Sequence, residues 1–110
     1  MKDLEPLVRA ALDSFKAKLV DELGARVRRL ALYGSVARGT ARWDSDVDVL
    51  VLLDTHTWRD ERRILDLAAD ELPARGVLLS PTVMSEAEYR DLQRRERRLP
   101  ADIERDGVPL

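Results

Sequence analysis

The sequence predicts an α+β fold with α/β-like character, in which a small mixed β-sheet of three or more strands is backed by helices. Apolar residues recur at helical spacing before Gly24. Two short apolar runs, at 27–33 and 47–53, are separated by a turn of small and polar residues. A helical segment then lies between the second run and a third, which is typical of a crossover between neighbouring strands.

The first half of the chain is predicted as helix, strand, turn and strand. Pro6 suits the first turn of the helix, and Gly24 suits its C-cap. A strand over 27–33 leads into a turn region over 34–45. The run 47–53 is apolar at nearly every position, so we expect a strand that is covered on both faces. The apolar helix positions are Val8, Leu12, Phe15, Leu19 and Leu23.

The second half is predicted to contain two helices and a strand. One helix runs from about Thr57 to Ala74, with Leu65, Ala68 and Leu72 on one face. A third strand follows over 77–84, and Pro81 within it favours an edge position or a bulge. The crossover should be right-handed with strands 47–53 and 77–84 parallel, whereas the first two strands could be antiparallel.

The last predicted helix begins at a capping box. Ser85 and Glu88 have the spacing of this motif. The helix is expected to reach Leu99 and to stop at Pro100, leaving residues 101–110 as a short tail.

Size and composition narrow the function classes. The chain of 110 residues is expected to form one domain, 1–110, without a separate substrate domain. Its net charge of −2 argues against nonspecific nucleic-acid binding as the main role. It has no cysteine and only His56, which excludes thiolate metal sites and leaves no histidine pair for a zinc site. There is no transmembrane run or secretory signal, so no membrane association and a cytoplasmic location are expected.

Residues 34–48 combine a glycine–serine turn with a pair of acids. Gly34 and Ser35 follow the first strand, where exposed backbone N–H groups can hold an anion. Asp46 and Asp48 open the second strand, and their alternate spacing places both on one face. Two adjacent carboxylates remain ionised most readily with a cation between them. The segment therefore predicts a metal-holding acid pair beside a phosphate-holding turn.

The pattern Gly34-Ser35-x-Ala37-Arg38-Gly39 followed by Ser45-Asp46-x-Asp48 resembles the signature of the minimal nucleotidyltransferases. These are the smallest members of the DNA polymerase beta-like nucleotidyltransferase superfamily. The resemblance is close over the strand–turn–strand segment and looser over the whole order of elements. It implies a nucleotidyltransferase fold and the metal-dependent transfer of a nucleoside monophosphate from a nucleoside triphosphate, with release of pyrophosphate.

The resemblance also implies roles for six residues. By matching position, Gly34 and Ser35 would hold the β- and γ-phosphates, and Asp46 and Asp48 would bind Mg²⁺ as catalytic acids. The nucleotide-binding set is completed by Arg38 and Ser45, which would support the phosphate loop or the triphosphate.

One part of the family pattern is missing. Active members carry a third carboxylate on the strand after the crossover helix, where it helps to hold the metal and can act as a base. Here Ser80 and Thr82 occupy the expected inward positions, and neither can replace a carboxylate as base. The nearest acids downstream, Glu86 and Glu88, are expected on the last helix.

Several residues have simpler interpretations beside the functional ones. Arg38 could form an ion pair with Asp44 at the surface. Arg42 and Trp43 could stack on a base, although Trp43 could equally pack the loop against the core. His56 is expected in a loop near a helix cap, and Tyr33 is expected to end the buried strand. The arginine-rich run 90–98 is interpreted as a solvated helix face, with an acidic or phosphate-rich partner as the alternative.

The leading hypothesis is an Mg²⁺-dependent enzyme that transfers AMP from ATP to a protein acceptor. Minimal members resemble the antitoxin halves of toxin–antitoxin pairs, so the expected partner is a helical HEPN-type ribonuclease, or a second copy in a homodimer. One alternative is a catalytically impaired nucleotide-binding module that neutralises a partner by binding. The other is the nucleotidylation of a small molecule such as an antibiotic.

Overall fold

A four-stranded mixed sheet forms the centre of the computed structural model, which describes residues 4–42 and 44–110. The strand order is β3-β2-β1-β4. β2 (Val47–Leu53) pairs antiparallel with β1 (Val27–Tyr33) and parallel with β3 (Leu79–Ser85). β4 (Val108–Pro109) pairs antiparallel with β1 on its other side. The predicted α+β class and strand directions are confirmed, and Pro81 lies on an edge strand as expected.

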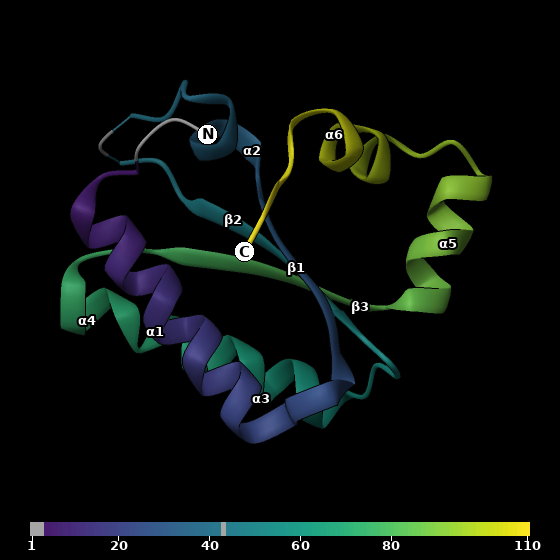
Figure 1. Cartoon of the computed structure of the whole chain (residues 1–110), viewed down its shortest axis with the longest axis horizontal. Helices are drawn as coiled ribbons and strands as arrows, with labels where there is room; N and C mark the ends of the chain where they lie inside the picture. The colour runs from purple at the N-terminus through teal and green to yellow at the C-terminus, as the bar shows by residue number, and fades with distance from the viewer. Residues whose placement is uncertain (1–3, 43) are drawn as a thin grey trace.

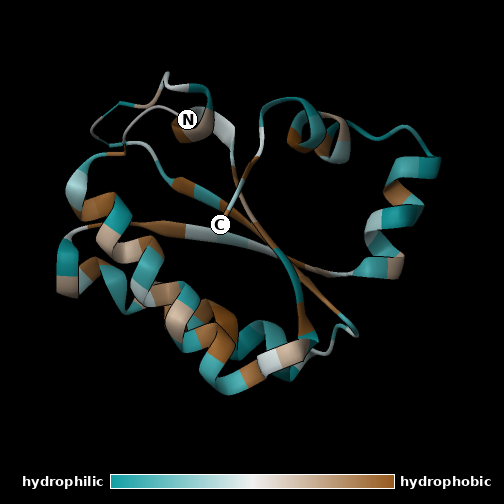
Figure 2. Cartoon of the chain, in the orientation of Figure 1, coloured by the Kyte–Doolittle hydropathy of each residue, from teal (hydrophilic) through white to brown (hydrophobic). Residues whose placement is uncertain are grey.

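Helices cover both faces of this sheet (Figure 1). One layer contains α1 (Pro6–Leu23), which a short turn η1 (Gly24–Arg26) joins to β1, together with α3 (Trp58–Ala69) and α4 (Glu71–Arg75). The other layer contains α5 (Glu86–Arg94) and α6 (Arg98–Asp106), beside α2 (Gly34–Arg38). Figure 2 shows that the strands are largely hydrophobic, whereas the helices alternate between polar and apolar surfaces.

The core is therefore divided by the sheet. β2 contributes Val49 and Val51 to the cluster under α1 and α3, and Leu50 and Leu52 to the cluster under α5 and α6. Both sets are buried, as predicted from the continuous apolar run. Side chains at even and odd positions of β2 thus face different layers, which also fixes the face on which Asp48 lies.

The predicted crossover helix is shorter than expected. The structure ends α3 at Ala69 and begins a separate α4 at Glu71. Pro73 accounts for the break, because proline has no N–H to donate to the carbonyl of residue 69. The buried face is also different: α3 buries Ile64, Leu67 and Ala68. Leu65 and Leu72, which were placed with Ala68, are exposed.

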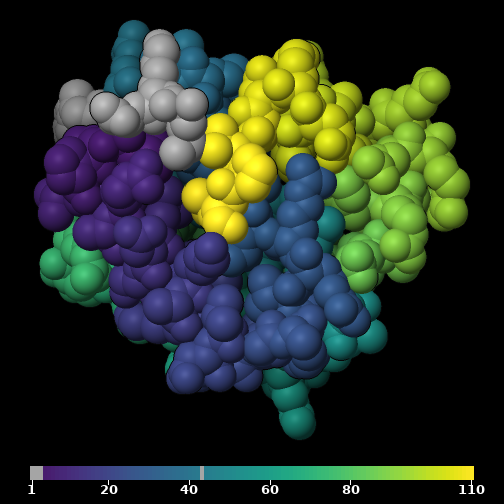
Figure 3. All heavy atoms as spheres, in the orientation of Figure 1, coloured from purple at the N-terminus to yellow at the C-terminus, as the bar shows by residue number. Residues whose placement is uncertain are grey.

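The prediction for the C-terminus was wrong. α5 ends at Arg94, and residues 98–106 form α6 instead of a tail. Pro100 is the third residue of α6, in the first turn, where its missing N–H has no partner to lose. The end of the chain then returns as β4, and Leu110 N donates to Leu30 O at 3.0 Å. Figure 3 shows this C-terminal segment in yellow against α1.

Within the described residues, no helix has both the length and the apolar character required to cross a bilayer.

Candidate active site

Asp48 is the second residue of β2 and lies on the sheet face covered by α5 and α6. Val47 and Val49 on either side of it face the opposite layer. The register places Tyr33 of β1 and Ser80 of β3 directly beside Asp48. The Asp48 side chain is half-buried at the end of the sheet, where the motif turn begins.

Gly34 brings the motif turn against this carboxylate. Its φ is +74°, in the region that favours glycine. A Cβ atom built at this position would overlap Oδ2 of Asp48 and would lie 3.1 Å from its Cγ. Only glycine therefore allows the backbone of the turn to lie so close to Asp48. The structure brings together the two halves of the sequence motif.

The electrostatics of Asp48 reflect a second negative charge nearby. Burial and the charge of Asp46 raise the pKa of Asp48, and the Arg38 guanidinium opposes them. The negative charge of Asp46 therefore acts on Asp48, since like charges disfavour the ionised form. A cation bound between them would relieve this repulsion.

Asp46 and Asp48 are suitable ligands for a magnesium ion whose remaining ligands are phosphate oxygens of a substrate and water. Mg²⁺ in nucleotide-processing sites binds one or two carboxylates together with phosphate oxygens and water. Asp46 and Asp48 supply such a pair. Within residues 4–42 and 44–110, no group of three or more acidic or histidine side chains is arranged to hold a metal.

The other predicted nucleotide-binding residues surround the turn. Ser35 is in α2, and its carbonyl accepts a hydrogen bond from Thr40 N at 2.9 Å. Arg38 is the last residue of α2 and is exposed, and in the described part of the chain it forms no ion pair with Asp44. The Ser45 hydroxyl accepts from Arg42 N at 2.8 Å and so closes the turn that precedes β2. The predictions for Trp43 fall outside the described residues.

A contact across β2 was missed by sequence reasoning. The Tyr33 hydroxyl lies 2.7 Å from Oγ1 of Thr82, so its side chain reaches over β2 from β1 to β3. Burial raises the pKa of the Tyr33 phenol. The Thr82 hydroxyl is therefore hydrogen-bonded to Tyr33, and Ser80 is the residue of β3 in register with Asp48. No sequence signal indicates this contact, because it depends on the register of three strands.

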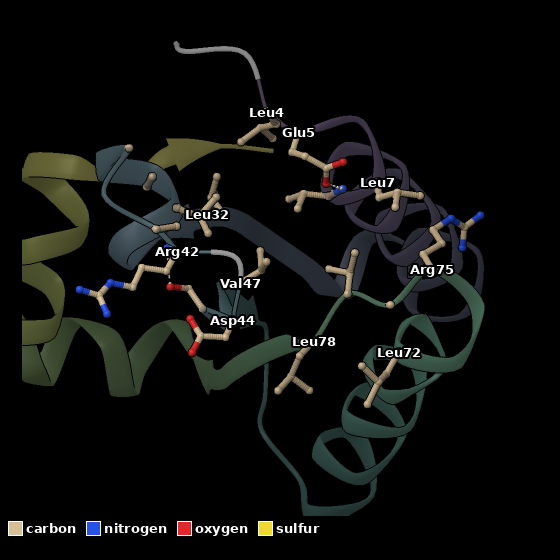
Figure 4. Close-up of a pocket in the computed structure, with 18 of the residues that line it drawn as sticks. Leu4, Glu5, Leu7, Leu32, Arg42, Asp44, Val47, Leu72, Arg75 and Leu78 are labelled. Atoms are coloured by element: carbon tan, nitrogen blue, oxygen red, sulfur yellow. Dashed lines mark hydrogen bonds between the residues drawn. The ribbon is translucent and has the colours of Figure 1, made fainter.

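One cavity of the molecule lies away from the acid pair. Its volume is about 710 Å³, and it opens between the start of α1, the turn after α2 and the α4–β3 connection (Figure 4). Arg42 and Ser45 line it, whereas Asp46 and Asp48 do not. Val47 and Leu32 also line it, which places the cavity on the sheet face opposite Asp48.

His56 forms a bridge that the sequence did not indicate. Its Nδ1 lies 2.8 Å from Oε1 of Glu88, and its Nε2 lies 2.9 Å from Oε1 of Glu61. The residue is close to the N-cap of α3, as predicted, but it also links that helix to α5. Its two nitrogens contact different carboxylates, in keeping with a structural role.

Comparison with known families agrees with this geometry. The family model of the nucleotidyltransferase domain matches residues 12–102. The chain belongs to this family. The expected resemblance and enzyme class are thus confirmed.

Relatives of this nucleotidyltransferase domain occur in Methanocaldococcus jannaschii. Two proteins there, MJ0141 and MJ0604, carry the provisional name protein adenylyltransferase and are each 32% identical to this chain. The matches cover 66% and 69% of this chain and 74% and 72% of the two relatives.

Solved structures show the same fold. A structure described as a minimal nucleotidyltransferase matches with a TM-score of 0.60 and 30% identity, over 94% of this chain and 92% of that one. A toxin–antitoxin structure with AMP-PNP matches with a TM-score of 0.54 and 20% identity, over 86% of this chain and 68% of its own. The second likeness shows the fold alone.

Proposed function

We propose that this domain transfers AMP from ATP to a protein acceptor in the presence of Mg²⁺, as the antitoxin half of a toxin–antitoxin pair. The observation that carries the proposal is the packing of Gly34 against Asp48. It sets the turn that would receive a triphosphate directly beside an acid pair that would hold a metal.

Each residue would act by position and charge. Asp46 and Asp48 would hold Mg²⁺, which supplies charge neutralisation at the α-phosphate when bound. The backbone at Gly34 and Ser35 would bind the terminal phosphates, with Arg38 and Ser45 supporting the loop. In the transfer, an acceptor hydroxyl oxygen bonds to the α-phosphorus and its proton passes to solvent water, while the bond to the bridging oxygen breaks and pyrophosphate leaves with that electron pair.

The proposed acceptor and partner are supported by the relatives and not by the geometry of the site. Relatives with the provisional name protein adenylyltransferase support a protein acceptor and AMP as the transferred group. The fold shared with a toxin–antitoxin structure supports a partner protein, for which a helical HEPN-type ribonuclease is our candidate. A homodimer is the other assembly we consider.

The direct test uses ATP labelled at the α-phosphate, Mg²⁺ and a HEPN-type ribonuclease as the candidate acceptor protein. We expect label on that protein, and loss of the label with Asp46→Asn or Asp48→Asn. Asp44→Asn is the matched control, because it removes an exposed carboxylate from the same loop and should leave transfer unchanged. Transfer that survives both Asp46→Asn and Asp48→Asn would contradict the proposal.

A second candidate is a nucleotide-binding module without turnover. The observation that favours it is Ser80, which stands beside Asp48 where a third carboxylate could help to hold the metal. Under this candidate the wild type binds Mg·ATP without transferring label. Ser80→Asp should then produce transfer or raise its rate at least tenfold. Ser80→Asn should not, because asparagine has the size of aspartate but no charge. If the wild type transfers label efficiently and Ser80→Asp adds nothing, this second candidate is wrong.

A further inference from the structure

The connection between α5 and α6 carries a dense group of arginines. Residues 90–98 contain five arginines and two acids, although the whole chain has a net charge of −2. We call this group the arginine turn, and all five of its arginines are exposed: Arg90, Arg94, Arg95, Arg97 and Arg98. Figure 1 shows the α5–α6 connection at the periphery of the molecule. The positive charge is therefore concentrated at one accessible place.

The acids of the segment neutralise only part of this charge. Asp91 contacts Arg94 at 3.3 Å and Arg95 at 3.2 Å. Among the residues that the structure describes, Arg90, Arg97 and Arg98 have no carboxylate within ion-pair distance. Neighbouring like charges repel each other and lower stability slightly. An anionic partner would remove that repulsion when it binds.

The backbone of the turn is fixed by its own hydrogen bonds. Glu96 has a φ of +53°, an uncommon conformation for a residue with a side chain. Glu96 N donates to Gln93 O at 3.0 Å, and Arg97 N donates to Leu92 O at 2.9 Å. The arginines therefore stand on a defined backbone, and less conformational entropy is lost on docking than from a flexible loop.

The arginine turn also has a defined relation to the candidate active site. α5 follows β3 directly, and α6 packs beside α2. Both helices cover the sheet face on which Asp48 lies. Glu104 of α6 anchors this layer, since it accepts from Arg29 at 2.9 Å and from the Tyr89 hydroxyl at 2.8 Å. A partner held at the arginine turn would lie against the layer that covers the acid pair.

We propose that the arginine turn is a docking surface for an acidic segment of a partner protein. Guanidinium groups bind carboxylates through paired hydrogen bonds, so arginine suits this partner chemistry. Nucleic acid fits less well, because residues 90–98 contain no aromatic side chain on which a base could stack. The residue that precedes this segment, Tyr89, is buried. Delivery of an acceptor to Asp48 would rest on the proposed function, whereas docking itself does not depend on it.

The test measures binding of poly-L-glutamate by fluorescence anisotropy at low salt. The test variant reverses the three unpaired charges, with Arg90→Glu, Arg97→Glu and Arg98→Glu. The control variant reverses three exposed arginines of the other helical layer, with Arg9→Glu, Arg59→Glu and Arg62→Glu, so both variants have the same net charge. We expect the test variant to bind at least tenfold more weakly than the wild type, and the control to remain within about threefold.

Three results would overturn the proposal: no binding of poly-L-glutamate by the wild type, equal losses in both variants, or tighter binding of a 20-residue oligouridylate through the same arginines.

Arg98→Glu places an acid in the first turn of α6, which favours the helix. A variant with Arg→Gln at the same three positions should give a smaller loss of poly-L-glutamate binding. It provides a second test if the charge-reversed variant misfolds. Asp48→Asn should not change binding, which separates a failure of docking from a failure of nucleotidyl transfer.

Discussion

Gly34 and Gly76 have nearly the same positive φ angle in different surroundings. Their φ angles are +74° and +71°. A Cβ at Gly76 would meet no atom within 4 Å, whereas one at Gly34 would overlap the Asp48 carboxylate. The pair therefore separates the strain of a left-handed backbone from the specific role of Gly34 beside the acid pair.

We expect Gly34→Ala and Gly76→Ala each to lower the free energy of unfolding by about 1–2 kcal/mol, because alanine is strained at positive φ. Gly34→Ala should in addition displace Asp48 and weaken Mg·ATP binding at least tenfold, while Gly76→Ala should leave binding unchanged. Calorimetric titration and chemical denaturation of both variants measure the two effects. Equal ATP affinity in the two variants would show that Gly34 has only a backbone role.

The His56 bridge between α3 and α5 should make the free energy of unfolding depend on pH through one identified residue. Both ring nitrogens are within hydrogen-bond distance of a carboxylate, and only the protonated ring can donate from both. Burial lowers the pKa of His56, but the hydrogen bonds to Glu88 and Glu61 outweigh it, so the net pKa is raised. The stabilisation is therefore complete below the unfolded-state pKa of histidine and is lost as the pH rises through the raised pKa.

His56→Gln should lower the free energy of unfolding by about 1 kcal/mol or less near pH 5.5, since the bridge is partly exposed. The difference from the wild type should shrink as the pH rises towards 8. Denaturant melts at several pH values measure it, and NMR titration of the ring protons should place the His56 pKa above 6.5. A difference that grows with pH would mean that the ring is neutral in the folded protein.

A buried acid ties α4 to its neighbours. Glu71 is fully buried, with Arg75 Nη1 at 2.6 Å from Oε1 and Lys18 Nζ at 3.6 Å from Oε2. Its Oε2 atom has no hydrogen-bond partner. Breaking a buried pair leaves a charge uncompensated, whereas replacing both partners with apolar groups can be nearly neutral.

Arg75→Met should therefore lower the free energy of unfolding by about 3 kcal/mol, and adding Glu71→Leu should restore most of it. A double-mutant cycle by urea denaturation provides the measurement. Arg63→Met is the control for an exposed pair with Glu22 and should change the value by less than about 1 kcal/mol. Additive effects of Arg75→Met and Glu71→Leu would contradict the coupling.

At the scale of elements, local signals predicted where helices begin better than where they end. The capping box at Ser85 and Glu88 is present with both of its hydrogen bonds. Pro100 was interpreted as a stop, but proline is equally compatible with the first turn of a new helix. Leu65 and Ile64 are adjacent and both apolar, so helical periodicity alone could not decide which of them faces the sheet. Tertiary packing decided these cases.

For the whole molecule, the sequence predicted the central strands of the sheet and the turn between them, but not α6 and β4. Gly34 follows β1 and Asp48 lies near the start of its partner strand β2, so the predicted strand–turn–strand unit was enough to bring these two residues together. α6 and β4 depend on contacts with β1, 75 to 80 residues earlier in the chain, through Arg29–Glu104 and Leu30–Leu110. Such long-range pairings leave no periodic signal in a single sequence. The last 13 residues are consequently part of the folded domain, with Ile103 in the core, and their contribution can be measured.

Ile103 of α6 is 1% exposed and packs in the cluster under α5 and α6. Ile103→Ala should lower the free energy of unfolding by about 3 kcal/mol through lost burial and a cavity. Leu65→Ala, at a residue that is 43% exposed, should change it by no more than about 0.5 kcal/mol. Thermal and urea unfolding of both variants, followed by circular dichroism, would test this. If α6 were an independent tail, Ile103→Ala would leave the main transition unchanged; because Ile103 shares its cluster with Ala31 and Leu50 of β1 and β2, the whole transition should shift as one.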